Sequence, residues 1–332
     1  MKDSEINPGK IMQTASAYWQ SLALHAAVKL DLFTILSEGH IGAAEVAARI
    51  GGDGRATATL LNALTAMGLL EKDKNTFSCT ELSNAYLSRK SPSHLSHIII
   101  HLHHLVDSWR RLDEAVLTGR PTRPRSSIRG EKEREAFLMG MFNAAMGIAP
   151  HAVKKIDLTG RKFLLDMGGG PGTWAIHFCL ANPDLRATVF DLPETKPFAE
   201  KTITRFGLND RILFRGGDYL KEEIEEGYDV AWLSQVLHGE GPDACRNMIR
   251  KAVAALLHGG LILVHDLILN NDMAGPLQPA LFSLNMLTGT DEGRSYSEQQ
   301  IMDMMREAGA EDIKRLPFHH PGETGIVMGI KP

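Results

Sequence analysis

Acidic residues end three successive apolar segments in the second half of the chain, and the first segment runs into a glycine-rich loop. FLLDMGGGPG, residues 163–172, places Asp166 before four glycines, RATVFDL reaches Asp191 25 residues later, and ILFRGGD ends at Asp218. Glycines allow backbone N–H groups to approach a nucleotide-like ligand. Carboxylates would repel phosphates. The pattern therefore favours a ligand with hydroxyls and an amine over a pyrophosphate, and a dehydrogenase-like dinucleotide site is the alternative.

Two histidines and an acid accompany the next expected strands. YDVAWLSQVL, residues 228–237, is almost entirely apolar and delivers His238 at its carboxyl end, where open α/β sheets place ligand chemistry. LILVHDLIL carries His265 and Asp266 as the only ionisable groups of an apolar run. We expect His238 to be catalytic, with a structural histidine as the alternative, and His265 to be packed in the interior. Asp266 fits either an acid that orients His238 or a structural acid.

Residues 150–332 resemble the catalytic domain of S-adenosylmethionine-dependent class I methyltransferases, because DMGGGPG stands in place of the glycine-rich loop and the FDLP and GGDY segments match. The resemblance implies an α/β fold with a Rossmann-like seven-stranded sheet. It also implies S-adenosyl-L-methionine as cofactor, S-adenosyl-L-homocysteine as product, and no metal. By resemblance, Asp191 would hold the ribose, Asp218 and Tyr219 would flank the adenine, and the glycines would shape the methionine pocket. The implied cofactor residues are Asp166, Gly168, Gly170, Asp191, Leu192, Asp218, Tyr219, Ser234 and Gln235.

The segment VLHGEGPDAC aligns with the family's LHDWxDexC, whose histidine is the general base that removes a hydroxyl proton during methyl transfer. By resemblance, His238 takes this role and Asp266 orients it. The family's second orienting acid would fall near Ser295 and is missing, with Glu240 and Glu292 as candidate substitutes.

The walls of the acceptor site are expected from a connecting helix, residues 131–149, and from residues 275–301. A stripe of methionine and phenylalanine is usually core, yet the family's connecting helix also covers the active site. Asn285 is expected either to bind a ring substituent or to cap a helix. The candidate substrate residues are Met141, Phe142, Met146, Phe282, Asn285 and Met286.

The first half begins with two expected helices over residues 11–36. IGAAEVAARIG, ATATLLNALTAMGLL and EKDKNTFSCT then follow the order of a winged helix-turn-helix. A DNA-binding regulator is one interpretation, but the expected recognition helix, residues 55–69, offers only Arg55 as a cation for phosphates. Residues 10–115 are instead similar to the N-terminal, mainly α dimerisation domain of plant-type small-molecule O-methyltransferases and their bacterial relatives. That similarity implies a homodimer.

Four histidines at spacings of three and four, His94, His97, His101 and His104, fall on one face of a helix expected over residues 94–116. Such imidazoles are able to bind a metal. No carboxylate or cysteine accompanies them within the stripe, so we favour a polar lining of the substrate cavity or a dimer surface.

Composition narrows the class of protein. The 332 residues carry a net charge of −4, which gives no general attraction to nucleic acid or to an anionic membrane. The arginines at positions 120, 123, 125 and 129 lie in a Pro-rich stretch that we expect to be a solvated connecting loop. Three cysteines without close spacing, no signal-like segment and no run of eighteen apolar residues favour a cytoplasmic protein.

The sequence predicts a winged-helix dimerisation domain at residues 1–115, a connecting loop and helix at 116–150, and a catalytic domain at 151–332. The expected activity is methyl transfer from S-adenosylmethionine to a hydroxyl of a small, flat aromatic or heteroaromatic molecule. Methylation of carbon or nitrogen, including a tetrapyrrole carbon, is one alternative. A regulator that senses the cofactor without catalysis is the other. No nucleic acid or membrane partner is expected.

Overall fold

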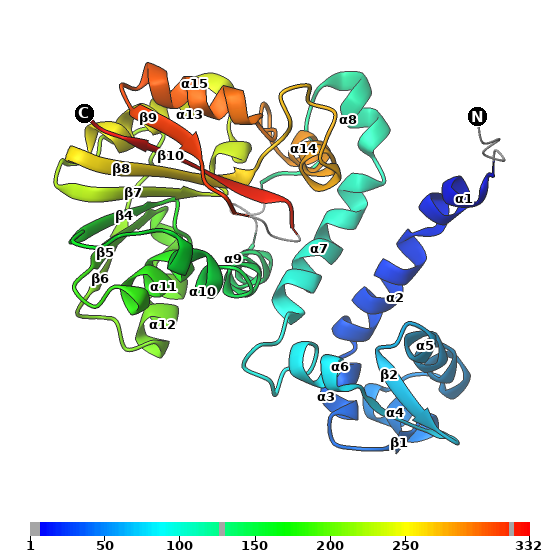
Figure 1. Cartoon of the computed structure of the whole chain (residues 1–332). Helices are drawn as coiled ribbons and strands as arrows, with labels where there is room; N and C mark the ends of the chain where they lie inside the picture. Colours follow the sequence, from blue (N-terminus) through cyan, green and yellow to red (C-terminus); the bar gives the residue numbers. More distant parts are fainter. Residues whose placement is uncertain (1–6, 126–129, 319–321) are drawn as a thin grey trace, which may run out of the picture. The chain divides into compact units, whose positions relative to one another are not determined.

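A computed structural model describes residues 7–125, 130–318 and 322–332. The chain forms two compact units, one up to His104 and one from Leu105 onward (Figure 1). The sequence position that divides them lies within helix α7, Ser96–Trp109.

The first unit combines helices with a small sheet. Its core is formed by apolar side chains from several elements, including Leu32, Val46, Leu61 and Phe77. In order, the elements that precede α7 are α1 (Gly9–Ser16), α2 (Tyr18–Lys29), α3 (Leu32–Leu36), β1 (Ile41–Gly42), α4 (Ala43–Ile50), α5 (Gly54–Ala66), β2 (Leu70–Asp73), β3 (Thr76–Cys79) and α6 (Glu81–Tyr86).

The helix, helix and hairpin order expected of the first half is present as α4, α5 and the β2–β3 pair. The strand order is β1-β3-β2, with antiparallel pairing. Two expectations were wrong in detail. Residues 11–36 hold three helices, because the chain turns at Asp31 with a φ of 55° between α2 and α3. His94 precedes the first residue of α7, Ser96, so it is not part of a histidine face on that helix.

The second unit contains a seven-stranded sheet of order β6-β5-β4-β7-β8-β10-β9, in which β10 is antiparallel to both neighbours. The elements after α7 are α8 (Leu112–Thr118), α9 (Glu131–Met146), α10 (Ala149–Ala152), η2 (Val153–Lys155), β4 (Phe163–Met167), α11 (Thr173–Ala181), β5 (Arg186–Asp191), η3 (Pro193–Thr195), α12 (Lys196–Arg205), β6 (Ile212–Gly216), β7 (Tyr228–Ser234), η4 (Leu237–Gly239), α13 (Pro242–Ala254), β8 (Leu256–Leu267), α14 (Leu277–Gly289), α15 (Glu298–Glu307), β9 (Glu311–Arg315) and β10 (Thr324–Ile330).

Both faces of this sheet are covered, which explains why its central strands are apolar throughout. Leu164 and Trp232 belong to the core on the side of α11 and α12. The adjacent Leu165 and Leu233 belong to the opposite core. Helices α13 and α15 cover the sheet on that side (Figure 1). Alternate residues of one strand therefore supply two separate cores.

The chain moves outward from β4 through β5 to β6, and then returns to place β7 and β8 on the other side of β4. In open α/β sheets, ligands bind at the carboxyl ends of the strands where the order reverses. The sheet therefore brings the segments that follow β4, β5 and β7 to one edge.

One expected helix boundary was also wrong. Pro242 near the start and the pair Gly259 and Gly260 as a stop signal predict a helix over residues 242–257. Helix α13 instead ends at Ala254, and both glycines lie inside β8. Leu256 already pairs with Tyr228 of β7, so sheet pairing takes over from the helix before the glycines are reached.

One helical stretch, Glu131–Lys155, is long and apolar enough by length and composition to cross a membrane. It is divided between α9, α10 and η2, and its side chains such as Leu138 and Phe142 are buried within the protein. Helices in protein cores pass the same test, so this stretch is weak evidence for a membrane span.

Candidate active site

The glycine-rich loop after β4 encloses a buried carboxyl. Asp166 is 0% exposed, and its Oδ2 accepts a hydrogen bond of 3.2 Å from the backbone N–H of Ala175 in the first turn of α11. Within the described chain, Oδ1 of Asp166 is buried without a hydrogen-bond partner. Burial raises the pKa of this carboxyl to about 7.

The conformation and the close packing of this loop both require glycine. Gly168 and Gly170 have φ values of 69° and 53°, a left-handed conformation that favours glycine. A Cβ at Gly168 would lie 2.7 Å from the Val236 side chain, and a Cβ at Gly169 would lie 2.6 Å from the Asp166 carboxyl carbon. Since Val236 precedes His238 by two residues, the loop lies directly against the segment that leads to His238.

Asp191 connects the loop to the end of β5. Its Oδ2 accepts a hydrogen bond of 2.7 Å from Gly170, and its Oδ1 accepts from the backbone of Leu192 at 2.7 Å and from the Thr195 hydroxyl at 3.1 Å. Burial raises the pKa of this carboxyl as well. A carboxylate oxygen is able to accept two hydrogen bonds, so Oδ2 retains capacity for a ligand hydroxyl.

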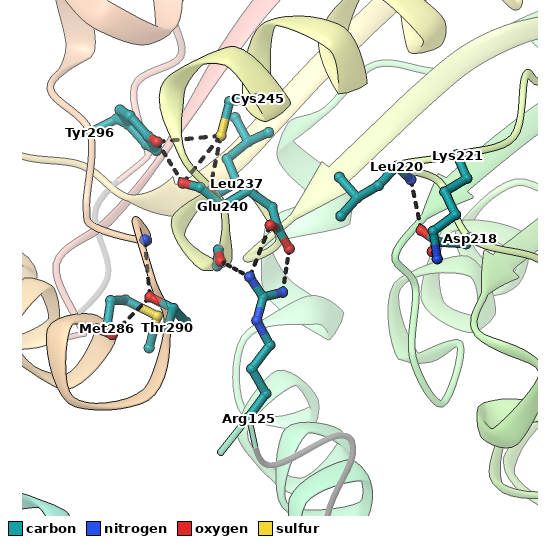
Figure 2. Close-up of polar contacts among 12 residues, drawn as sticks. Arg125, Asp218, Leu220, Lys221, Leu237, Glu240, Cys245, Met286, Thr290 and Tyr296 are labelled. Carbon is teal, nitrogen blue, oxygen red and sulfur yellow. Dashed lines mark hydrogen bonds and ion pairs between the residues drawn. The ribbon is translucent and has the colours of Figure 1, made fainter. Parts of the chain in front are cut away.

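Asp218 lies beyond the end of β6 and is partly exposed. It accepts hydrogen bonds from the Leu220 backbone at 2.9 Å and pairs with Lys221 at 2.8 Å (Figure 2). The next residue, Tyr219, lies beside Gly168, and burial raises the pKa of its hydroxyl.

His238 occupies η4, the turn that follows β7, and it contacts Asp266 near the end of β8. Nδ1 of the imidazole lies 2.7 Å from Oδ1 of Asp266, whose side chain is only 4% exposed. A carboxylate accepts hydrogen bonds, so this contact assigns the proton to Nδ1 and leaves the lone pair on Nε2. Asp266 is itself held by the backbone N–H of Leu267 at 2.8 Å.

Ser234 is the last residue of β7, and Gln235 follows it three residues before His238. The Ser234 hydroxyl is 2.8 Å from Nδ1 of His265, and the Gln235 backbone, with a φ of 52°, donates to the His265 carbonyl at 2.7 Å. His265 is 0% exposed and its ring stacks on Trp232. The interior packing expected of His265 is therefore confirmed.

Helix α14 carries two expected substrate residues with defined contacts: Phe282 contacts His238, and Asn285 contacts Trp109. The Phe282 ring meets the His238 ring edge-on, with 4.7 Å between centroids. One turn later, the Asn285 amide oxygen accepts a hydrogen bond of 3.2 Å from the Trp109 indole. Asn285 lies inside α14, so it does not cap a helix end. Met286 is 8% exposed and follows on the same helix.

Two of the three candidates on α9 have contacts of a core helix. Phe142 is 3% exposed and packs against Phe206, and the Met146 sulfur lies 3.2 Å from Nε2 of His177. His177 lies in α11 and Phe206 follows the last residue of α12, so both contacts suit a core helix. That these residues line the acceptor site stays a prediction. Met141 is half-buried.

An ion pair between Arg125 and Glu240 lies beside His238 and was not expected from the sequence. Arg125 was expected in a solvated loop, but its guanidinium binds the buried Glu240 carboxylate and the Gly239 carbonyl beside His238 (Figure 2). Glu240 is therefore occupied by Arg125 and does not serve as the second acid on His238. Ser295, at the family's position for that acid, is fully buried. The two partners are 115 residues apart, and no local signal in the sequence connects them.

Among residues 7–125, 130–318 and 322–332, no group of three or more His, Cys, Asp or Glu side chains is arranged to hold a metal ion. In the first unit, His103 contacts Lys29 through its Nε2 at 3.0 Å and meets the His25 ring edge-on. A nearby ammonium group disfavours a cationic ligand at this position.

The hydrogen-bond acceptors at the edge of the sheet fit S-adenosylmethionine. The unpartnered, buried Oδ1 of Asp166 is an acceptor for an ammonium group, and Asp191 is an acceptor for ribose hydroxyls. A Cβ at Gly168 would clash with the Val236 side chain and would lie 3.6 Å from the Tyr219 ring, so the absence of a side chain lets the loop backbone pack closely against both residues.

Comparison with known proteins agrees with this geometry. Residues 109–311 match the family model of the O-methyltransferase domain, and residues 12–89 match that of the O-methyltransferase dimerisation domain. The chain is 32% identical to a 3-hydroxy-5-methyl-1-naphthoate 3-O-methyltransferase of Streptomyces sahachiroi, over 98% of this chain and 95% of that protein.

Two further relatives bear on cofactor and acceptor. The structure of human N-acetylserotonin methyltransferase in complex with S-adenosylmethionine matches with a TM-score of 0.88 and 27% identity, over 100% of this chain and 99% of that one. The N,N-dimethyltransferase OxyT of Streptomyces rimosus is 28% identical over 90% of this chain and 89% of that protein.

Proposed function

The chain belongs to the S-adenosylmethionine-dependent O-methyltransferases, and on that premise we propose that His238 is the general base that deprotonates the hydroxyl of a flat aromatic acceptor. The observation that carries the proposal is the 2.7 Å contact between Nδ1 of His238 and Asp266. It leaves Nε2 as the acceptor of a proton.

Asp266 contributes in two ways. Its carboxylate holds the imidazole in one orientation, and its negative charge stabilises the imidazolium that forms when His238 takes the proton. Because the Asp266 side chain is 4% exposed, water screens this interaction little. The bound cofactor supplies an electrophilic methyl group on a sulfonium.

We assign the cofactor to the loop after β4 and the ends of β5 and β6. Asp166 would bind the amino group of the methionine part, Asp191 the ribose hydroxyls, and Asp218 with Tyr219 the adenine side. Support comes from the buried acceptor on Asp166 and from the closeness of Gly168 to Tyr219.

The acceptor is proposed to be a small aromatic or heteroaromatic molecule with a ring hydroxyl. The Phe282 ring beside His238 provides an apolar wall that suits a flat ring. The Trp109 indole orients the Asn285 amide, whose NH₂ group is then a donor for a ring substituent. The naphthoate acceptor named for the Streptomyces sahachiroi relative belongs to this class.

An amine acceptor is the second candidate, favoured by the similarity to the N,N-dimethyltransferase OxyT. A neutral amine already carries the attacking lone pair, so methylation of nitrogen has less need of a base at His238. The two candidates therefore differ in how strongly the reaction depends on His238.

The experiment is methyl transfer from labelled S-adenosylmethionine to a panel of hydroxyaromatics and arylamines, with products identified by mass. His238→Ala should lower kcat for a hydroxyl acceptor by about 100-fold or more, because general base catalysis typically contributes about 10²- to 10⁴-fold. His258→Ala, at an exposed histidine of the same sheet, is the matched control. Undiminished O-methylation in His238→Ala would refute the base, and N-methylated product alone would favour the second candidate.

The protein is further proposed to act as a homodimer through the dimerisation domain that residues 12–89 match. Exposed apolar side chains on α1 and α2, including Ile11 and Trp19, are available for a partner subunit. A cytoplasmic location is proposed because Cys79, Cys179 and Cys245 are free thiols.

A further inference from the structure

Arg125 forms a forked ion pair with the turn that carries His238. Its Nη1 lies 2.5 Å from Oε1 of Glu240 and its Nη2 lies 2.9 Å from Oε2. Nη2 also donates to the carbonyl of Gly239 at 2.8 Å (Figure 2). Three hydrogen bonds from a planar guanidinium fix the direction of its partners as well as their distance.

The same turn is also held by Tyr296, which precedes α15, and by Cys245 of α13. The Tyr296 hydroxyl donates to the Glu240 carbonyl at 2.6 Å, and the Cys245 thiol donates to the Leu237 carbonyl at 3.1 Å (Figure 2). Residues on either side of His238 in the chain are therefore anchored. The position of His238 depends on these contacts as well as on Asp266.

Arg125 is itself carried by a segment fixed to α14. The backbone N–H groups of Thr122 and Arg123 donate to the Thr288 carbonyl at 3.0 and 3.1 Å. Helix α14 also presents Phe282 to the His238 ring. The chain from Thr122 to Arg125 thus connects the helix that forms the acceptor wall to the turn that holds the base.

The burial of the Arg125–Glu240 ion pair indicates that it sets the relative position of two segments rather than adding stability. The Glu240 side chain is 7% exposed, whereas that of Arg125 is 38% exposed. An ion pair of this kind gives little net stability compared with apolar side chains of the same volume. It does hold two segments at a set distance and orientation, and a displacement of about 1 Å at a reacting group is able to cost about 100-fold in rate.

We propose that Arg125 is a positioning residue that, through Glu240 and Gly239, holds His238 at the distance from the acceptor wall that proton removal requires. The inference rests on the proposed role of His238 as base. It assigns a function in the reaction to an arginine outside the residues that contact substrate or cofactor.

The test is a double-mutant cycle of Arg125→Ala and His238→Ala, with kcat measured at saturating cofactor and hydroxyl acceptor. Arg125→Ala should lower kcat by about 10- to 100-fold, while the Kd for S-adenosylhomocysteine changes by less than about threefold. In the His238→Ala background, Arg125→Ala should lower kcat by less than about threefold, because residues that act through one another are not additive. Arg120→Ala, an exposed arginine in the same segment, is the matched control.

A second variant separates positioning from folding. Arg125→Met combined with Glu240→Gln removes both charges and leaves no unpaired buried carboxylate, so it should fold with a Tm near that of the wild type and still lose kcat. Full kcat in this variant, or losses that multiply across the cycle, would overturn the role of Arg125. Full activity in His238→Ala would overturn both proposals, whereas loss in His238→Ala with none in Arg125→Ala would overturn this one alone.

Discussion

Replacing Asp166 with asparagine should change how the stability of the ligand-free protein depends on pH. Asp166 is 0% exposed, and burial raises the pKa of its carboxyl from 3.8 to about 7. A raised pKa means that the fold favours the protonated carboxyl. Its stabilising contribution is therefore complete below pH 3.8 and is lost as the pH rises to 7.

The magnitude follows from the size of this shift. About 3 pH units at about 1.4 kcal/mol each correspond to about 4 kcal/mol, of which about 3 kcal/mol falls between pH 5 and pH 8. Asparagine has the same shape and does not titrate, and its amide oxygen still accepts from Ala175. The difference in free energy of unfolding between variant and wild type should move by about 3 kcal/mol in favour of the variant from pH 5 to pH 8.

Urea unfolding followed by tryptophan fluorescence measures this difference in the free energy of unfolding for the catalytic unit of the chain. Trp174 and Trp232 are buried in the catalytic unit, so their emission reports its unfolding. Asp243→Asn, at an exposed acid, is the control and should leave the pH dependence unchanged. Parallel pH profiles for Asp166→Asn and the wild type would refute the reasoning, because they would mean that Asp166 is ionised across this range.

The same variant tests the cofactor site. A carboxylate that pairs with the ligand's amino group must release its proton, so wild-type affinity for S-adenosylhomocysteine should rise between pH 6 and pH 8. In Asp166→Asn, this affinity should fall by about tenfold or more, because a charged hydrogen bond contributes about 1.5–3 kcal/mol. Calorimetry that finds equal affinity in both proteins would exclude Asp166 from the cofactor site.

Two further changes test the catalytic pair and the loop. Asp266→Asn should lower kcat by about 10- to 100-fold through loss of a charged hydrogen bond of about 1.5–3 kcal/mol, with little change in KM for S-adenosylmethionine; a kcat within about twofold of wild type would contradict the orienting role. Gly169→Ala would place a Cβ 2.6 Å from the Asp166 carboxyl carbon, so binding of S-adenosylhomocysteine should weaken by about tenfold, whereas Gly54→Ala, with open space around its Cβ, should bind normally. Equal titration curves for the two glycine variants would show that the loop tolerates the displacement.

Much of the fold was predictable because its signals are local. The apolar runs that became β4, β5, β7 and β8 are buried on both faces, and the glycines after β4 adopt backbone conformations that favour glycine. The helix, helix and hairpin order of the first unit follows from patterns of a few residues. These features need no knowledge of distant contacts.

Errors occurred where a distant partner overrides a local pattern. The helix predicted to reach residue 257 stops at Ala254 because Leu256 pairs with β7. Phe142 and Met146 form an apolar stripe that suits either a core or a ligand wall, and their contacts with Phe206 and His177 are compatible with both. Spacing along α9 alone does not distinguish the two.

The amino-acid sequence alone determined the class of fold, the cofactor and the family. Each of these follows from residue types within short segments, and each such segment has one backbone arrangement in this fold. Only the tertiary structure decided that Arg125 meets the turn that carries His238. Asp266 is 28 residues from His238 in the chain and was expected beside it through the resemblance, whereas Arg125 is 115 residues from Glu240 and nothing in the sequence connects the two. Contacts over such separations depend on how strands and loops pack, and packing is a property of the whole folded chain rather than of any one segment.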